Sequence, residues 1–250
     1  MKRLLIIFIL LGFPMAAYCT WNPKECLSKE YSASLDLLQD PDFVNLKAKV
    51  ISHVHNDLWH SEEKVNLLMD IVLLTKPENC VEVGTYAGAS FLPIAAALRF
   101  IGHGHAFAID PWSGAEALRG IPKSDEYHNK LYAYVNMDWI HQQFLDTMEN
   151  WSLDSYCTSY WAPSGQAIDH IDQIDFLHLD GNYSEEGALL DAQLYLPKVL
   201  PGGYILLSHV FIVVDKKCTK MKALWYLLDR CEIIAEIPHV NGYAVLFRKS

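Results

Sequence analysis

The chain has 250 residues, of which 51% are hydrophobic, and its 30 acidic residues exceed its 20 lysines and arginines, giving a formal net charge of −10. A chain of this length can bury one substantial core, and we therefore expect one domain of catalytic size. Because lysine and arginine are the residues that hold phosphates, the acidic balance argues against nucleic acids and anionic membranes as non-specific partners and favours a small molecule.

The first 19 residues have the layout of a secretory signal. Lys2 and Arg3 precede an apolar run from Leu4 to Phe13, and small residues follow near Ala17. The run is shorter than the roughly 20 residues that span a membrane as a helix. We predict a signal peptide over residues 1–19 and export to the periplasm or into the secretory pathway. The alternative is an uncleaved N-terminal anchor, the one case in which we expect the protein to associate with a membrane.

Residues 20–60 show helical periodicity and are predicted to form a helical cap in front of the main domain. From residue 61 onward, short apolar stretches alternate with amphipathic ones, as is typical of an α/β domain with a mostly parallel sheet. The predicted helices are 61–75, 90–100, 164–171, 184–196 and 220–228, with one helix or a helix pair over 123–150, and the predicted strands are 79–84, 105–110, 155–162, 174–180 and 203–208.

The last part of the chain has a different pattern. Residues 231–237 and 242–249 read as two strands that are separated by a short turn. A connection this short cannot form a helical crossover, so the final strand is predicted to run antiparallel to its neighbour.

The stretch EVGTYAGAS, from Glu82 to Ser90, ends the first predicted strand and leads into a helix. In doubly wound sheets ligands bind at such a turn, and Gly84 and Gly88 lack the Cβ atoms that would keep a ligand from the backbone. Asp110 ends the next predicted strand, 28 positions after Glu82. An acid at that place can accept hydrogen bonds from both ribose hydroxyls, which suits either NAD or S-adenosylmethionine (SAM).

Three details favour SAM over NAD. The turn reads E-x-G-x-x-x-G instead of G-x-G-x-x-G, nothing in it is suited to a pyrophosphate, and the terminal strand pair is foreign to a plain dinucleotide fold. Together with AIDPWSG, FLHLDGNYSEEG and LPKVLPGGYILLS, the turn resembles the class I SAM-dependent methyltransferases, closest to the catechol-type O-methyltransferases and the methyltransferase 24 group. The resemblance implies a Rossmann-like α/β sandwich over residues 61–250, with a mostly parallel seven-stranded sheet whose last strand is antiparallel.

The resemblance also implies where SAM binds. The glycine turn surrounds the methionine part, Glu82 orients the amino group through the loop, and Tyr86 or Ser90 contacts the carboxylate. Asp110 binds the ribose and Trp112 flanks the adenine; plain core packing is the alternative for Trp112. The complete set of expected cofactor-binding residues is Glu82, Gly84, Tyr86, Gly88, Ser90, Asp110, Trp112, Ser164, Gly165 and Gln166.

In catechol-type enzymes the resemblance further implies a divalent metal, held by an acid after the fourth strand and an acidic pair after the fifth. Asp180 stands at the first position, but Ser208 and His209 stand at the second. His209 could bind a transition metal or act as a general base. Tyr183 occupies the place of the family's usual base and is expected to contact the substrate. Three readings stay open: an enzyme with His209 as base, a metal-dependent enzyme using Asp180, Asn182 and His209, and a SAM-binding protein without turnover.

These observations predict a SAM-dependent methyltransferase that acts on a hydroxyl of a small molecule or sugar. The alternatives are a non-catalytic binding protein that has lost the metal and base site, and an NAD-dependent oxidoreductase. The substrate pocket is expected from residues 20–60 and 113–150, where the resemblance is weakest, and the sequence is silent on the oligomeric state.

Overall fold

The computed structural model describes residues 21–55, 61–210, 213–214, 217–239 and 242–250. The predicted signal peptide or anchor over residues 1–19 lies outside these ranges. Among the described residues, no helix combines the length and the apolar character needed to cross a membrane.

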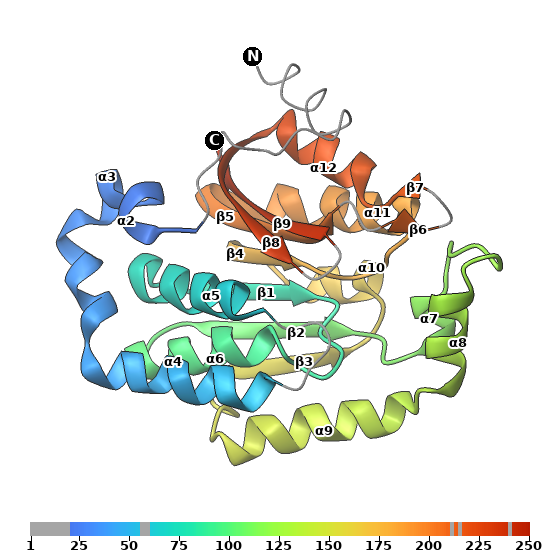
Figure 1. Ribbon diagram of the computed structural model, residues 1–250, viewed down its shortest axis with the longest axis horizontal. Helices are drawn as coiled ribbons and strands as arrows, with labels where there is room; N and C mark the ends of the chain where they lie inside the picture. The colour runs from blue at the N-terminus through green and yellow to red at the C-terminus, as the bar shows by residue number, and fades with distance from the viewer. Residues whose placement is uncertain (1–20, 56–60, 211–212, 215–216, 240–241) are drawn as a thin grey trace.

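A seven-stranded sheet forms the centre of the molecule, in the order β3-β2-β1-β4-β5-β9-β8 (Figure 1). The five strands from β3 to β5 are parallel to one another, whereas β9 is antiparallel to both β5 and β8. The predicted mostly parallel sheet with an antiparallel last strand is therefore confirmed. The strands are β1 (Asn79–Val83), β2 (His105–Asp110), β3 (Cys157–Trp161), β4 (Ile174–Leu179), β5 (Val199–Val210), β8 (Cys231–His239) and β9 (Gly242–Lys249).

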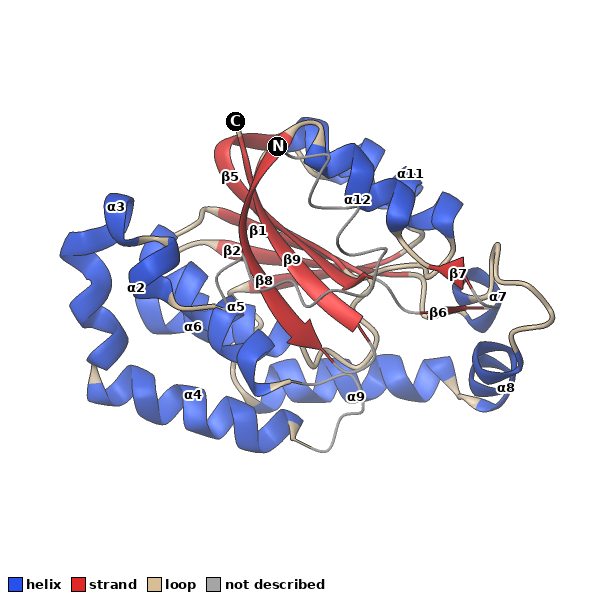
Figure 2. Cartoon of the chain, turned by 45° about the horizontal axis from the view of Figure 1, so that its top comes forward, coloured by secondary structure: helices blue, strands red, loops and turns tan. Residues whose placement is uncertain are grey.

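Helices cover both faces of the sheet, because successive strand residues point to opposite sides and both sides are apolar (Figure 2). In β1, Cys80 belongs to one core cluster and Val81 to the other. The first cluster is completed by α4 (Pro41–Val54), α5 (Glu62–Thr75), α6 (Phe91–Ile101) and α9 (Met137–Asn150), and the second by α10 (Ser164–Ala167), η2 (Ile168–His170), α11 (Glu185–Tyr195) and α12 (Met221–Leu228).

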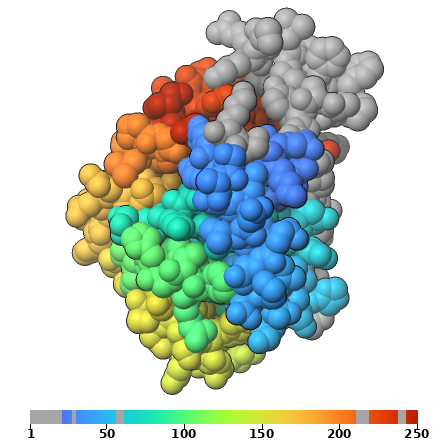
Figure 3. All heavy atoms as spheres, turned by 90° about the vertical axis from the view of Figure 1, so that its left-hand side faces the viewer, coloured from blue at the N-terminus to red at the C-terminus, as the bar shows by residue number. Residues whose placement is uncertain are grey.

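The N-terminal residues form the predicted helical segment, which runs along the outside of α5 and α6 (Figures 1 and 3). Asp70 of α5 anchors it by accepting hydrogen bonds from the Trp21 indole at 3.2 Å and the Lys47 ammonium at 2.7 Å. Glu30 pairs with Arg248 of β9. The segment consists of α2 (Pro23–Cys26), α3 (Ser28–Tyr31), η1 (Ser32–Gln39) and α4.

Several shorter helices come after the main strands in the chain and lie near the cavity that is described below. The predicted helix or helix pair over 123–150 is a pair, α8 (Glu126–Tyr134) and α9, each begun by a side-chain cap. Elements that were not predicted are α7 (Gly114–Ala117), η3 (Leu196–Lys198) and the two-stranded ladder of β6 (Val213–Val214) and β7 (Lys217–Cys218).

Candidate functional site

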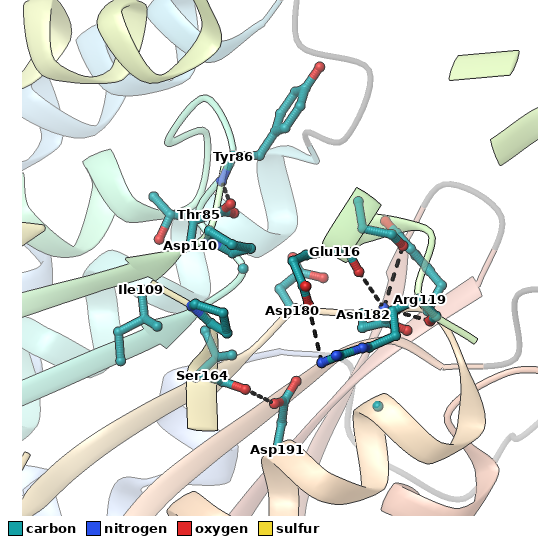
Figure 4. A pocket seen from close by; sticks show the side chains of 18 of the residues that line it. Thr85, Tyr86, Ile109, Asp110, Glu116, Arg119, Ser164, Asp180, Asn182 and Asp191 are labelled. Carbon is teal, nitrogen blue, oxygen red and sulfur yellow. Dashed lines mark hydrogen bonds and ion pairs between the residues drawn. The ribbon is translucent and has the colours of Figure 1, made fainter. Parts of the chain in front are cut away.

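A cavity of about 540 Å³ opens at the carboxyl ends of β1, β2 and β4, where ligands bind in doubly wound sheets (Figure 4). Part of the segment 113–150 lines it, as predicted, through α7, α8 and the start of α9. None of residues 21–55 lines it, because the N-terminal helices pack on α5 and α6 instead. Residues 56–60, also expected in the substrate pocket, lie outside the described residues. The wall residues come mainly from 83–90, 109–120, 163–166 and 180–191, with Lys64, Tyr132, Met137 and His209 in addition.

Gly84 allows two loops to meet at the floor of the cavity. Its φ is +88°, and a Cβ there would lie 2.5 Å from the Asp180 carbonyl oxygen and from the Gly181 Cα. Only glycine fits both the torsion and the contact. The chain after β1 therefore turns directly against the chain after β4, which makes Gly84 and Asp180 neighbours at the floor of the cavity.

Asp110 lies at the end of β2, at the edge of the cavity (Figure 4). Its two carboxylate oxygens accept hydrogen bonds from the backbone N–H of Tyr86, at 2.9 Å, and of Trp112, at 2.7 Å. Burial raises the pKa of Asp110, and these amide donors oppose that shift. Each carboxylate oxygen has a second lone pair, so Asp110 can still accept hydrogen bonds from a diol, as predicted for a ribose.

Trp112 does not line the cavity, and the expectation that it flanks an adenine is not supported. Its side chain is buried against Phe144 and His141, with ring centroids 5.5 and 4.1 Å away. Its indole N–H donates to the Tyr86 carbonyl oxygen at 2.8 Å. The Trp112 ring thus supports the glycine turn from the core side. This is the core packing that was the alternative for Trp112.

The other expected cofactor residues divide into two groups. Tyr86, Ser90, Ser164, Gly165 and Gln166 line the cavity. Glu82 and Gly88 lie beneath it: a Cβ on Gly88 would come within 2.8 Å of the Phe144 ring, so this glycine is needed for packing of the turn on α9. The expected residues therefore line this cavity or lie directly beneath it, with Trp112 displaced into the core.

Glu82 belongs to a buried hydrogen-bond chain that crosses the sheet. It accepts a hydrogen bond from the Ser90 hydroxyl, and the two ring nitrogens of His178 contact Glu82 at 2.9 Å and Ser208 at 2.8 Å. Burial raises the pKa of Glu82 to about 8, and it lowers that of His178 well below its usual value. Near neutral pH this hydrogen-bond chain is therefore mostly uncharged. It holds the hydroxyl of Ser90 in place, and Ser90 is its one residue that lines the cavity.

Asp180 follows β4 and is surrounded by positively charged or titratable side chains. Lys64 Nζ lies 2.8 Å from Oδ2 and Lys220 Nζ 3.7 Å from Oδ1, while His209 Nε2 lies 3.3 Å from Oδ1. Burial alone would raise the pKa of Asp180, but these three neighbours together with His178 hold it well below its usual range. Asp180 is therefore an ionised carboxylate at any pH at which the protein is studied.

Comparison with known proteins agrees with this geometry. The model of a family described as a methyltransferase domain, methyltransferase 24, matches residues 81–209, or 129 of the 250 residues. The chain belongs to this methyltransferase family. The match begins in β1 and ends at His209, so it spans both the glycine turn and Asp180.

Solved structures share the fold of this methyltransferase at low sequence identity. The O-methyltransferase NovP is 15% identical with a TM-score of 0.58, over 84% of this chain and 98% of that chain. TomG from Streptomyces achromogenes, solved with SAM, is 12% identical with a TM-score of 0.55, over 90% and 99%. An O-methyltransferase from Bacillus cereus, solved with SAH, is 11% identical with a TM-score of 0.53, over 89% and 99%. No curated protein sequence matches the chain.

Family and fold confirm the interpretation as a class I SAM-dependent methyltransferase. Neither comparison supports the alternatives of an NAD-dependent oxidoreductase or a non-catalytic binding protein. The E-x-G-x-x-x-G turn and the terminal strand pair are the sequence features that separate a SAM-binding protein from an NAD-dependent oxidoreductase.

The residues around Asp180 do not suit the divalent metal of the catechol-type enzymes. Two lysine ammonium groups contact the carboxylate from which a metal would need oxygen ligands, and Ser208 is engaged with His178. Within the described part of the chain, no group of three histidines, cysteines, aspartates or glutamates is placed to hold a metal ion. The doubtful assignment of Asp180 and His209 as metal ligands is therefore not supported.

His209 and Tyr183, the other two expected catalytic residues, both line the cavity. His209 interrupts β5 with a φ of +57°, at an irregularity in its pairing with β9. Such a torsion is costly for a residue other than glycine and is found preferentially at functional sites. The Tyr183 ring lies 5.6 Å from the His209 ring and 5.0 Å from His128, so it forms an aromatic wall beside His209.

Sequence reasoning missed Lys64, Lys220 and Asp191. Asp191 is a buried cavity residue that accepts a hydrogen bond from Ser164 at 2.5 Å, and burial raises its pKa to about 6. A signal for Lys64 was available: it stands in the first turn of a helix, where the dipole disfavours a cation, and on the apolar stripe that continues through Leu68 and Ile71. No comparable signal marks Lys220 or Asp191.

Proposed function

We propose that this methyltransferase transfers a methyl group from SAM to a hydroxyl oxygen of a small molecule. The observation that carries the proposal is one cavity with two ends, the glycine turn with Asp110 at one and Asp180 with His209 at the other. A cofactor end and a proton-accepting end in a single cavity are what an in-line displacement needs.

The cofactor end fits SAM. The Gly84 turn leaves the backbone open to a ligand, Asp110 can bind a diol, and Ser90 is oriented toward the cavity by Glu82. When bound, SAM supplies an electrophilic methyl group whose bond to sulfur breaks as the bond to the acceptor oxygen forms, with the electron pair remaining on sulfur. Ser164, Gly165 and Gln166 also line the cavity and suit the edge of the adenine base.

At the other end, His209 is the group suited to take the acceptor's proton. Its Nε2 faces the ionised Asp180 at 3.3 Å, which orients the ring and stabilises the imidazolium that forms when the proton is taken, as the aspartate does in a catalytic triad. Tyr183 is suited to pack against the acceptor. The proton then passes from His209 to solvent, so the products are SAH, the methylated acceptor and a proton.

The test is calorimetric binding of SAM and SAH, followed by transfer of radiolabelled methyl from SAM to a panel of phenols, catechols and sugars. We expect Asp110→Ala to abolish binding, and Asp172→Ala, an exposed acid before β4 at the opposite edge of the sheet, to leave it unchanged. Absence of SAM binding by the folded wild-type protein would refute the proposal.

We also propose export or N-terminal anchoring, on the strength of the basic and apolar residues at the start of the sequence. Fractionation of a C-terminally tagged protein, with its mass compared with that of the full chain, is the test. A shortened product outside the cytoplasm supports a signal peptide, a full-length membrane-bound product supports an anchor, and a full-length product in the cytoplasm contradicts both.

A further inference from the structure

Two lysines share one carboxylate at the proton-accepting end of the cavity. The side chains of Lys64 and Lys220 are only 4% and 1% exposed, and both ammonium groups are within 4 Å of Asp180. Lys64 reaches it from the first turn of α5 and Lys220 from the residue before α12. Lysine is almost never buried to this extent unless its charge is compensated.

The two lysines share the negative charge of this cluster unequally. Asp180 is ionised, while the other buried groups on the neighbouring strands, Glu82 and His178, are mostly neutral near pH 7 for the reasons given above. Protonation of His209 would only add to the positive charge. Asp110 is bound by backbone amides elsewhere on the cavity wall. Burial lowers the pKa of Lys220, and the neighbouring carboxylates Asp180 and Asp191 oppose that shift. Lys220 is therefore compensated by two carboxylates, whereas among the described residues the Lys64 ammonium forms an ion pair with Asp180, which it shares with Lys220.

The two lysines are not equivalent. Lys220 does not line the cavity, and its ammonium lies over the Tyr183 ring, 5.1 Å from the centroid. Lys220 therefore compensates the negative charge of Asp180 from outside the cavity lining. Lys64 lines the cavity, and since an ammonium has three N–H donors, its bond to Asp180 leaves donors for a ligand. The ammonium group that can meet a ligand in the cavity is therefore that of Lys64.

We propose that Lys64 takes the place of a divalent metal in this methyltransferase and holds the acceptor oxygen of a phenol as its anion. The proposal rests on the proposed function and names its substrate class. An ammonium beside the acceptor oxygen stabilises the charge that develops when the proton leaves, as a metal ion would, through a fixed charge in a site largely closed to water.

A phenol suits this site better than a sugar hydroxyl. Phenols lose their proton at a pH of about 10, as tyrosine does, whereas alkyl alcohols are far weaker acids and a single ammonium polarises less than a divalent ion. The cavity walls also carry Tyr86, Tyr183, Tyr132 and Met137, which offer ring faces and apolar surface to an aromatic acceptor.

The first arm of the experiment tests the absence of a metal. Mn²⁺ is titrated into the metal-stripped, SAH-saturated wild-type protein, and free Mn²⁺ is followed by electron paramagnetic resonance. We expect the wild-type protein to bind no more Mn²⁺ than the Asp180→Asn variant does. One equivalent of Mn²⁺ bound by the wild type and lost in Asp180→Asn overturns the proposal.

The second arm uses 4-nitrophenol, whose absorbance distinguishes phenol from phenolate, at a pH where most of the free probe is neutral and with EDTA present. We expect the SAH-saturated wild type to bind the phenolate. Lys64→Met should weaken that binding about 10-fold or more, the size of a lost charged hydrogen bond, and Lys64→Arg should restore part of it. Lys47→Met is the matched control, because it removes another lysine–aspartate pair, with Asp70, remote from the cavity.

The wild-type spectrum alone can overturn the proposal, whether or not Lys64→Met folds. Probe bound as neutral phenol, or no binding to a folded, SAH-saturated protein, contradicts it, as does equal phenolate binding by a folded Lys64→Met. Failure of the proposed function has a separate result, a folded protein that binds neither SAM nor SAH. If that protein still bound phenolate, the role of Lys64 in binding the anion would be supported, while the methyltransferase function would be refuted.

Discussion

His178 Nδ1 lies 2.9 Å from Glu82 Oε1, and the two residues are register partners on the adjacent strands β4 and β1. Both side chains are fully buried. The second Glu82 oxygen, Oε2, has no hydrogen-bond partner among the described residues. A carboxylate with one oxygen unpaired in a closed interior is costly, which is the physical reason that burial raises the pKa of Glu82 to about 8.

Glu82 should make the protein less stable as the pH rises. Its folded pKa of about 8 is above the ordinary value of 4.5, so between these values the folded state retains a proton that the unfolded state has lost. The free energy of unfolding then falls with rising pH, by at most about 1.4 kcal/mol per pH unit. Glu82→Gln removes this contribution, and urea denaturation from pH 5 to pH 9 should show a shallower decline than in wild type.

Asp191 and Glu236 also have raised pKa values, about 6 and about 7, so part of the decline will remain in Glu82→Gln. The informative quantity is therefore the difference between the two proteins at each pH. Parallel stability curves for wild type and variant would contradict the assignment of a protonated Glu82.

Gly84→Ala should destabilise the protein more than the matched change Gly102→Ala. Both glycines have positive φ, +88° and +66°, but a Cβ at Gly84 would collide with the backbone of Asp180 and Gly181, whereas nothing lies within 4 Å of one at Gly102. We expect Gly102→Ala to lower the free energy of unfolding by about 1 to 2 kcal/mol because of the torsion alone. Gly84→Ala should lower it by more. Denaturant unfolding measures both, and equal losses would show that the two loops are not in contact.

Asp180→Asn should strongly destabilise the protein, because it leaves the Lys64 and Lys220 ammonium groups buried without their counter-charge. Breaking a buried pair by removal of one partner costs about 3 to 5 kcal/mol. Adding Lys64→Met and Lys220→Met to Asp180→Asn should recover part of this loss, since the residues are directly coupled. Urea denaturation of the single and triple variants tests the coupling, and a triple variant with additive losses would argue against it.

His209→Asn should impair methyl transfer without affecting SAM binding. Asparagine tolerates the left-handed torsion of this position but cannot accept the proton. A general base contributes about 10²- to 10⁴-fold to rate, so a loss of that size is expected in kcat with an acceptor found in the panel above. Calorimetry with SAM provides the control. A kcat within about threefold of wild type would exclude His209 as the base.

The fold could be predicted from the sequence because its signals are local. Apolar strands alternate with amphipathic helices, and the connection between the last two strands is too short for a crossover, which dictates the antiparallel β9. Asp110 and Asp180 could be placed at the cavity because each directly ends a strand, and parallel strands end at the same edge of a sheet.

The lysine cluster could not be predicted in this way. Lys64 is 116 positions from Asp180, and no spacing rule joins them; the contact exists only because α5 packs on the face of the sheet to which Glu82 and His178 point. Trp112 was misplaced for a related reason. It directly follows the ribose acid in sequence, but its positive φ of +39° turns it away from the cavity and into the core beside α9.

The pair formed by Glu30 and Arg248 has a consequence for synthesis of the chain. The two residues are 218 positions apart, so the N-terminal helices must wait for almost the whole chain to leave the ribosome before this contact can form. β8 waits as well, since its one partner in the sheet is β9, the strand made after it. Until β9 is inserted, β5 and β8 each have an unpaired edge, and such edges are prone to join other chains. The nascent methyltransferase should therefore be most vulnerable to aggregation just before its last strand emerges.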